Sequence, residues 1–160
     1  MIDWARYSRR DLIFEIFHTI YIPETVLGEI RSESTIYWIT ENMARDRIAL
    51  FTETPEIREE AIRIMRESRR YPIKSIDYPE ALCISIGKML GIIVLSENGG
   101  AYFSQYIYLR GLSVWRAFEV LLELYKRGLI ERSEFTRYQV ETHHRFPRRD
   151  LEALGIGETF

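Results

Sequence analysis

The chain has 160 residues, 46% of them hydrophobic and 13% aromatic, and its 22 basic and 24 acidic residues leave a formal net charge of −2. This length and apolar content suit a single globular domain and exclude a disordered chain. A net charge this close to zero excludes a bulk-charge argument for nucleic-acid binding and leaves only a local basic patch open. The lone cysteine, Cys83, excludes an internal disulfide and a cysteine-type zinc site, and it predicts a reducing, cytoplasmic compartment.

The predicted elements alternate between helices and short apolar strands. Apolar periodicity predicts helices over 10–17, 23–30 (running on or resuming through 35–46), 55–71, 80–90, 101–110, 117–128 and 133–146. Short apolar runs predict strands over 19–23, 47–52, 92–96 and 112–115. Thr54 and Pro55 are typical of a helix start, and Gly91 is typical of a helix end.

Targeting and membrane signals are absent from the sequence pattern. The charged residues 1–11 are not followed by the apolar run of a signal peptide. The most apolar stretches, 90–95 and 115–125, are too short or too amphipathic to span a bilayer, so we expect no membrane association. Gln and Asn are scarce while Ile, Arg and Glu abound, a bias that resembles proteins from hot habitats.

Helices alternating with strands indicate an α/β fold, a short parallel sheet covered on both faces in three α/β/α layers. Ligands of such sheets bind beyond the carboxyl ends of the strands. Glu29, Glu80 and Glu97 lie at these ends or on the helices that follow them, with Asn98 beside Glu97. Carboxylate oxygens suit Mg²⁺ or Mn²⁺, which can polarise a phosphodiester. Position alone favours structural roles: a helix-dipole partner for Glu80, a solvated residue for Glu29 and a turn residue for Glu97.

Three segments occur in an order that resembles the PIN-domain family, the metal-dependent ribonucleases that include the VapC-type toxins: DLIFEIFHTIYIPETVLGEI (11–30), PEALCISIGKMLGIIVLSEN (79–98) and GLSVWRAFEVLLELYKRGLI (111–130). The resemblance is strongest over residues 9–131 of a single domain, with residues 132–160 as a C-terminal helical extension.

The resemblance implies an active site and partners. Glu29 and Glu80 match the second and third active-site acids of the family, and Glu97 or the neighbouring Asn98 matches the last. These residues would hold one or two Mg²⁺ or Mn²⁺ ions, and a metal-bound water would attack an RNA phosphate, leaving a 3′-hydroxyl and a 5′-phosphate. A homodimer and an antitoxin protein that covers the acidic groove belong to the same expectation.

The sequence departs from the PIN pattern at two places. PIN domains begin with a buried strand that ends in Asp, and here only Met1 and Ile2 precede Asp3, the one candidate for that ligand. Glu97 and Asn98 replace the pair of Asp residues after the fourth strand. Without the first strand, the strands over 19–23 and 92–96 would each leave an edge unpaired. A start upstream, a rearranged sheet and a strand from a partner chain all remain open explanations.

These departures favour a second hypothesis, a PIN-like domain without catalysis that serves as an RNA-binding or protein-interaction module. A third hypothesis is an α/β domain with an unrelated small-molecule role. The basic run Arg145, Arg148 and Arg149 is a candidate for contacts to nucleic-acid phosphates, although a solvated face is the favoured explanation.

Two further groups of residues predict no metal or base-stacking site. His143 and His144 are adjacent on a predicted helix and therefore point about 100° apart, which disfavours a shared metal. A short predicted helix carries four aromatic residues, from which we expect core and dimer contacts rather than a base-stacking platform: Tyr102, Phe103, Tyr106 and Tyr108.

Overall fold

The computed structural model describes residues 2–155. The first half of the chain forms α1 (Ile2–Arg6), the 3-10 helix η1 (Arg10–Glu15), β1 (Ile20–Pro23), α2 (Glu24–Glu29), α3 (Glu33–Met43), β2 (Ile48–Phe51) and α4 (Pro55–Ser68). The second half forms α5 (Tyr78–Leu90), β3 (Val94–Leu95), α6 (Gly99–Ile107), β4 (Val114–Trp115), α7 (Ala117–Lys126), α8 (Ser133–Thr142) and α9 (Arg148–Ala153). None of the helices in this range is long and apolar enough to cross a membrane.

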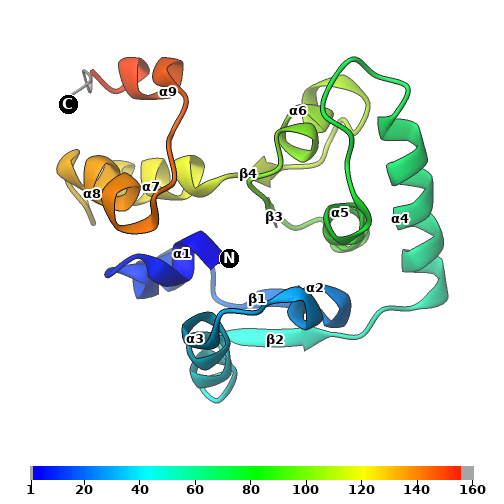
Figure 1. The fold of residues 1–160 in the computed structure, drawn as a ribbon, viewed down its shortest axis with the longest axis horizontal. Helices are drawn as coiled ribbons and strands as arrows, with labels where there is room; N and C mark the ends of the chain where they lie inside the picture. The colour runs from blue at the N-terminus through cyan, green and yellow to red at the C-terminus, as the bar shows by residue number, and fades with distance from the viewer. Residues whose placement is uncertain (1, 156–160) are drawn as a thin grey trace.

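The fold is mixed α/β, and its strands form two parallel pairs, β1–β2 and β3–β4. Ile20 stands opposite Ile48 in the first pair, and Val94 stands opposite Val114 in the second. The parallel pairing expected from the sequence is therefore confirmed. The expected single sheet is not, because no strand within residues 2–155 joins the two pairs, which Figure 1 shows apart.

Most predicted elements form near their predicted positions, with local causes that the structure makes visible. The Thr54 hydroxyl accepts the N–H of Ile57 and so caps α4, and Gly91 ends α5 in the left-handed conformation at φ 65°. One predicted helix is too long: α8 ends at Thr142, because His143 takes a left-handed conformation at φ 58°. His144 therefore lies in the loop before α9 rather than on a helix.

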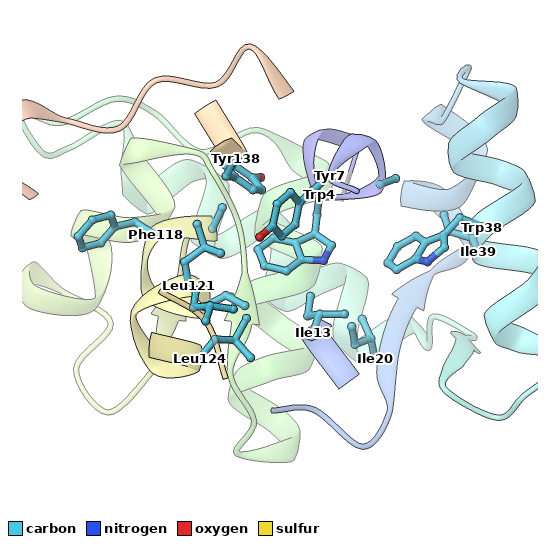
Figure 2. Packing of buried hydrophobic residues seen from close by; sticks show 14 of the residues in the cluster. Trp4, Tyr7, Ile13, Ile20, Trp38, Ile39, Phe118, Leu121, Leu124 and Tyr138 are labelled. Carbon is cyan, nitrogen blue, oxygen red and sulfur yellow. The ribbon is translucent and has the colours of Figure 1, made fainter. Parts of the chain in front are cut away.

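The first hydrophobic cluster joins the two ends of the described chain (Figure 2). The Trp4 ring in α1 lies 5.4 Å from the Tyr138 ring in α8, and the Tyr7 ring lies 5.2 Å from Tyr138. The Trp4 indole also donates a hydrogen bond to the Arg10 carbonyl, at 2.7 Å. Burial of these aromatic rings fixes α1, a helix too short to persist alone, against α8.

The second hydrophobic cluster lies between α4, α5 and the β3–β4 pair. Val94 and Val114 contribute to this cluster, whereas Leu95 and Trp115 pack against the first one. Neighbouring residues of a strand point to opposite faces, so each two-residue strand links both clusters. This placement holds the carboxyl ends of β3 and β4, and the residues that follow them, in a fixed position.

Candidate functional site

Glu97 connects the end of one strand to the helix that follows its neighbour. It lies just beyond β3, while α7 starts just beyond the paired strand β4. The Oε1 atom of Glu97 accepts the backbone N–H of Ala117, the first residue of α7, at 2.5 Å. The first N–H groups of a helix have no partner within the helix and carry partial positive charge. The Glu97 carboxylate therefore stabilises the start of α7.

Glu53 stabilises the start of a helix in the same way in the other strand pair. It follows β2, and its Oε1 atom accepts the backbone N–H of Thr25, in the first turn of the helix after β1, at 2.9 Å. Burial by itself would raise the pKa of Glu53, but the hydrogen bonds from Thr25 and the charge of Arg58, 3.4 Å away, outweigh it and lower the pKa below its ordinary value. The sequence analysis missed Glu53, although its place directly after a predicted strand was a usable signal.

His144 brings together two of the predicted metal ligands, Asp3 and Glu97. Its Nδ1 atom lies 3.4 Å from Asp3 Oδ2, and its Nε2 atom lies 3.3 Å from Glu97 Oε2. All three side chains are partly exposed, at 21% for His144, 35% for Asp3 and 32% for Glu97, so a solute can reach them. They come from α1, the loop after β3 and the loop after α8, which only the tertiary fold brings together.

The other two predicted acids do not join this group. Glu29 is the exposed last residue of α2, and Glu80 is half-buried in the first turn of α5. Within residues 2–155, neither Glu29 nor Glu80 makes a hydrogen bond or an ion pair with Asp3, His144 or Glu97. Glu80 lies instead toward the Cys83 thiol, whose pKa burial raises to about 12, with further increases from the charges of Glu80 and Glu53.

Asn98 has a structural role of its own. Its side-chain oxygen accepts the backbone N–H groups of Gly100 at 2.8 Å and Ala101 at 3.3 Å, which caps the start of α6. The same oxygen is the atom that the PIN resemblance would assign to a metal. Its part in metal binding stays a prediction.

The predicted basic residues lie in the last described segment and contact acidic neighbours. Arg148 pairs with Glu152 at 2.7 Å, and Arg149 lies 3.5 Å from Asp150, while Arg145 is exposed in the loop before α9. Their contact with nucleic acid is untested and stays a prediction.

Arg116 is the most strongly engaged cation near the site, and the sequence analysis did not identify it. Its guanidinium group pairs with Glu119 at 2.6 Å and with Asp150 at 2.9 Å, and it lies 3.9 Å from the centre of the Tyr102 ring. Burial opposes its charge, but the two carboxylates outweigh burial and raise the pKa of Arg116 above its ordinary value. Arg116 immediately precedes Ala117, so it links the start of α7 to both α6 and α9.

The donor atoms of the group suit a divalent metal, but their arrangement is tied to His144. Asp3 Oδ2 and Glu97 Oε2 are carboxylate ligands of the kind that Mg²⁺ and Mn²⁺ prefer, whereas an imidazole nitrogen suits later transition metals such as Zn²⁺. The two ring nitrogens of His144 face different carboxylates, so one ion cannot contact all three groups at once. Accordingly, the described residues contain no set of three side chains already arranged around one ion. A metal held by both Asp3 and Glu97 would require His144 to leave its place between them and the two carboxylates to move toward each other.

A surface pocket of about 660 Å³ lies elsewhere. It is lined by η1 and by residues 45–47, at the amino ends of β1 and β2. Two of its arginines are already paired with acidic residues, Arg9 with Glu134 at 3.4 Å and Arg45 with Glu41 at 2.7 Å. The Asp3–His144–Glu97 group therefore stays the better candidate, because it lies at the strand ends where α/β sheets bind ligands.

Comparison of the chain with protein-family models, with curated proteins and with solved structures finds no match. The resemblance to PIN domains thus rests on the three quoted segments and stays an expectation.

Proposed function

We propose that the chain is a PIN-like endoribonuclease domain that depends on a divalent metal. One observation supports the proposal above the others: Asp3 and Glu97, matched by the resemblance to the first and last active-site acids, converge on His144 beyond the end of β3. Convergence of two acids from distant segments at this edge is what a metal-dependent phosphodiesterase requires.

The strand pairing is compatible with the same proposal. In the PIN sheet the first strand lies between the strands that correspond to β1 and β3. A three-layer PIN sheet without that strand would leave two parallel pairs, as β1–β2 and β3–β4 are here.

Each side chain of the site then has a task. Asp3 and Glu97 would hold the metal, whereas Glu29 and Glu80, the further acids that the resemblance implies, lie apart from them on α2 and α5. When bound, the metal would polarise the RNA phosphate and activate a water molecule for attack. Glu97 is held in place by its hydrogen bond from Ala117. His144 lies between the two carboxylates with one ring nitrogen facing each, and it would have to leave this place for a metal to bind both. An antitoxin partner and a homodimer remain predictions of the same resemblance.

A second function is favoured by a different observation. Both Glu97 and Asn98 use a side-chain oxygen to complete the start of a helix, α7 and α6 respectively. Selection for these caps alone would retain both residues in a PIN-like module that binds RNA or a protein without cleaving it.

Metal titration separates the two functions. Isothermal titration with Mn²⁺ is compared between the wild type, Asp3→Asn, Glu97→Gln and the control Glu59→Gln, an exposed acid on α4. The nuclease proposal expects saturable binding that the first two substitutions abolish and the control retains, together with Mn²⁺-dependent cleavage of single-stranded RNA. Thermal melting of each variant checks the fold, since Gln keeps an oxygen that can accept the Ala117 N–H. Absence of saturable binding at millimolar Mn²⁺ would contradict the nuclease and leave the interaction module.

A further inference from the structure

Helix α6 exposes aromatic rings that the sequence analysis expected in the core. Phe103 is 38% exposed and Tyr106 is 63% exposed, so a core position is wrong for both, while the expected dimer contact stays a prediction. The Tyr102 ring lies 5.5 Å from the Phe103 ring and 5.8 Å from the Tyr106 ring. These three residues, the α6 aromatic face, form a contiguous set of rings on one short helix. An exposed cluster of this kind indicates a binding surface, whereas single exposed rings do not.

Arginine side chains adjoin the α6 aromatic face. The Arg149 guanidinium lies 5.6 Å from the centre of the Phe103 ring, and the Arg116 guanidinium lies 3.9 Å from that of Tyr102. Both arginines share the single carboxylate of Asp150, at 3.5 Å and 2.9 Å. Glu119 also pairs with Arg116, so the two carboxylates balance the charge of the two arginines. Arg149, whose side chain is 63% exposed against 10% for Arg116, is the cation that solvent and ligands can reach.

The α6 aromatic face is continuous with the candidate site. Helix α6 starts directly after Glu97 and Asn98, and Asn98 caps it. On the other side, Arg116 contacts Tyr102 while the next residue, Ala117, donates its N–H to Glu97. The amino end of α6 therefore lies next to Glu97 of the Asp3–His144–Glu97 group.

We propose that the α6 aromatic face and Arg149 form a docking surface for single-stranded RNA, with bases stacked on Phe103 and Tyr106 and a phosphate at Arg149. Exposed rings beside a cation match the two chemical features of a single strand, unpaired base faces and a charged backbone. A second copy of the chain is the alternative occupant, which the binding measurement distinguishes from RNA. The inference rests on the proposed function for the choice of RNA, and it adds the surface that positions the strand.

The test measures RNA binding separately from cleavage. Fluorescence anisotropy of a labelled short single-stranded RNA is recorded in EDTA, where no metal-dependent cleavage occurs, with wild type, Phe103→Ala, Tyr106→Ala, Tyr106→Phe and Arg149→Gln. Tyr37→Ala is the matched control, because Tyr37 is 70% exposed on α3 and is not part of the α6 aromatic face. Loss of one stacking ring is expected to raise Kd by about fivefold or more, while Tyr106→Phe and Tyr37→Ala retain affinity. Arg149→Gln is expected to weaken binding and to reduce its salt dependence.

Three outcomes would overturn the docking surface: no RNA binding by the wild type, equal affinity of Tyr106→Ala and Tyr37→Ala, or a wild-type dimer that Tyr106→Ala dissociates without a change in RNA affinity. The last outcome would assign the face to self-association. The same measurements test the nuclease proposal independently of the docking surface. RNA binding in EDTA without cleavage in Mn²⁺ supports the docking surface and contradicts the nuclease. Cleavage with a KM unchanged by Tyr106→Ala supports the nuclease and contradicts the docking surface.

Discussion

The Glu97 carboxylate faces two partners at once: Oε1 accepts the backbone N–H of Ala117 at 2.5 Å, and Oε2 lies 3.3 Å from Nε2 of His144. One oxygen therefore belongs to the architecture of the β3–β4 pair and the other to the candidate site. Changes at Glu97 act on stability and on ligand binding together, and variants have to separate the two effects.

Removing the capping oxygen is expected to destabilise the protein. Glu97→Ala leaves the first N–H of α7 without its acceptor, at a cost of about 0.5–2 kcal/mol in the free energy of unfolding. Glu97→Gln keeps an acceptor oxygen and is expected to lose less. Urea denaturation of both variants measures the difference, with the exposed Glu59→Ala on α4 as control. Equal stability of Glu97→Ala and wild type would show that water replaces the carboxylate at no cost.

Trp4 is expected to anchor α1. It is 4% exposed and packs against Tyr138, so Trp4→Ala should lower the free energy of unfolding by about 3–5 kcal/mol. Because α1 carries Asp3, the same variant should also weaken any metal binding that needs Asp3. Thermal or urea unfolding monitors the first effect, and Tyr37→Ala on the surface should change stability by no more than about 0.5 kcal/mol. A native-like stability of Trp4→Ala would mean that α1 contributes little to the fold.

The Cys83 thiol is expected to be unreactive in the folded protein. Burial raises the pKa of Cys83 to about 12, so almost none of the reactive thiolate is present at pH 8. Ellman's reagent should therefore label the native protein far more slowly than the protein in denaturing urea, which provides the internal reference. Fast labelling under native conditions would contradict the buried, acid-flanked position of the thiol.

Glu53 is expected to make stability depend on acid pH. Its pKa is lower in the folded state than the value of about 4.3 for a free Glu side chain, so its contribution is fully present well above pH 4.3. That contribution is lost as the pH falls through the folded pKa, because the protonated acid no longer pairs with Arg58. Urea denaturation between pH 7 and pH 3 should show a smaller loss of stability in Glu53→Gln than in wild type. Parallel pH profiles would contradict the prediction.

Local chemistry along the chain determined most of the secondary structure. The helix start at Thr54 and Pro55 and the helix end at Gly91 follow from hydrogen bonding and backbone freedom within a few residues, so the sequence alone located them. Short apolar runs likewise predicted the strands, and their alternation with helices predicted the parallel pairing. The same local reasoning placed His144 on a helix, because nothing near it in the sequence indicates that His143 turns left-handed.

The tertiary structure alone decided which side chains meet. The sequence singled out Asp3 and Glu97 as acids, but it could not show that His144 lies between them, since the three residues come from three separate segments. It also gave no sign of α1, a five-residue helix that exists because Trp4 is buried against Tyr138. Backbone hydrogen bonds in helices are local and leave a pattern in the sequence, whereas contacts across the core depend on how all the elements pack at once.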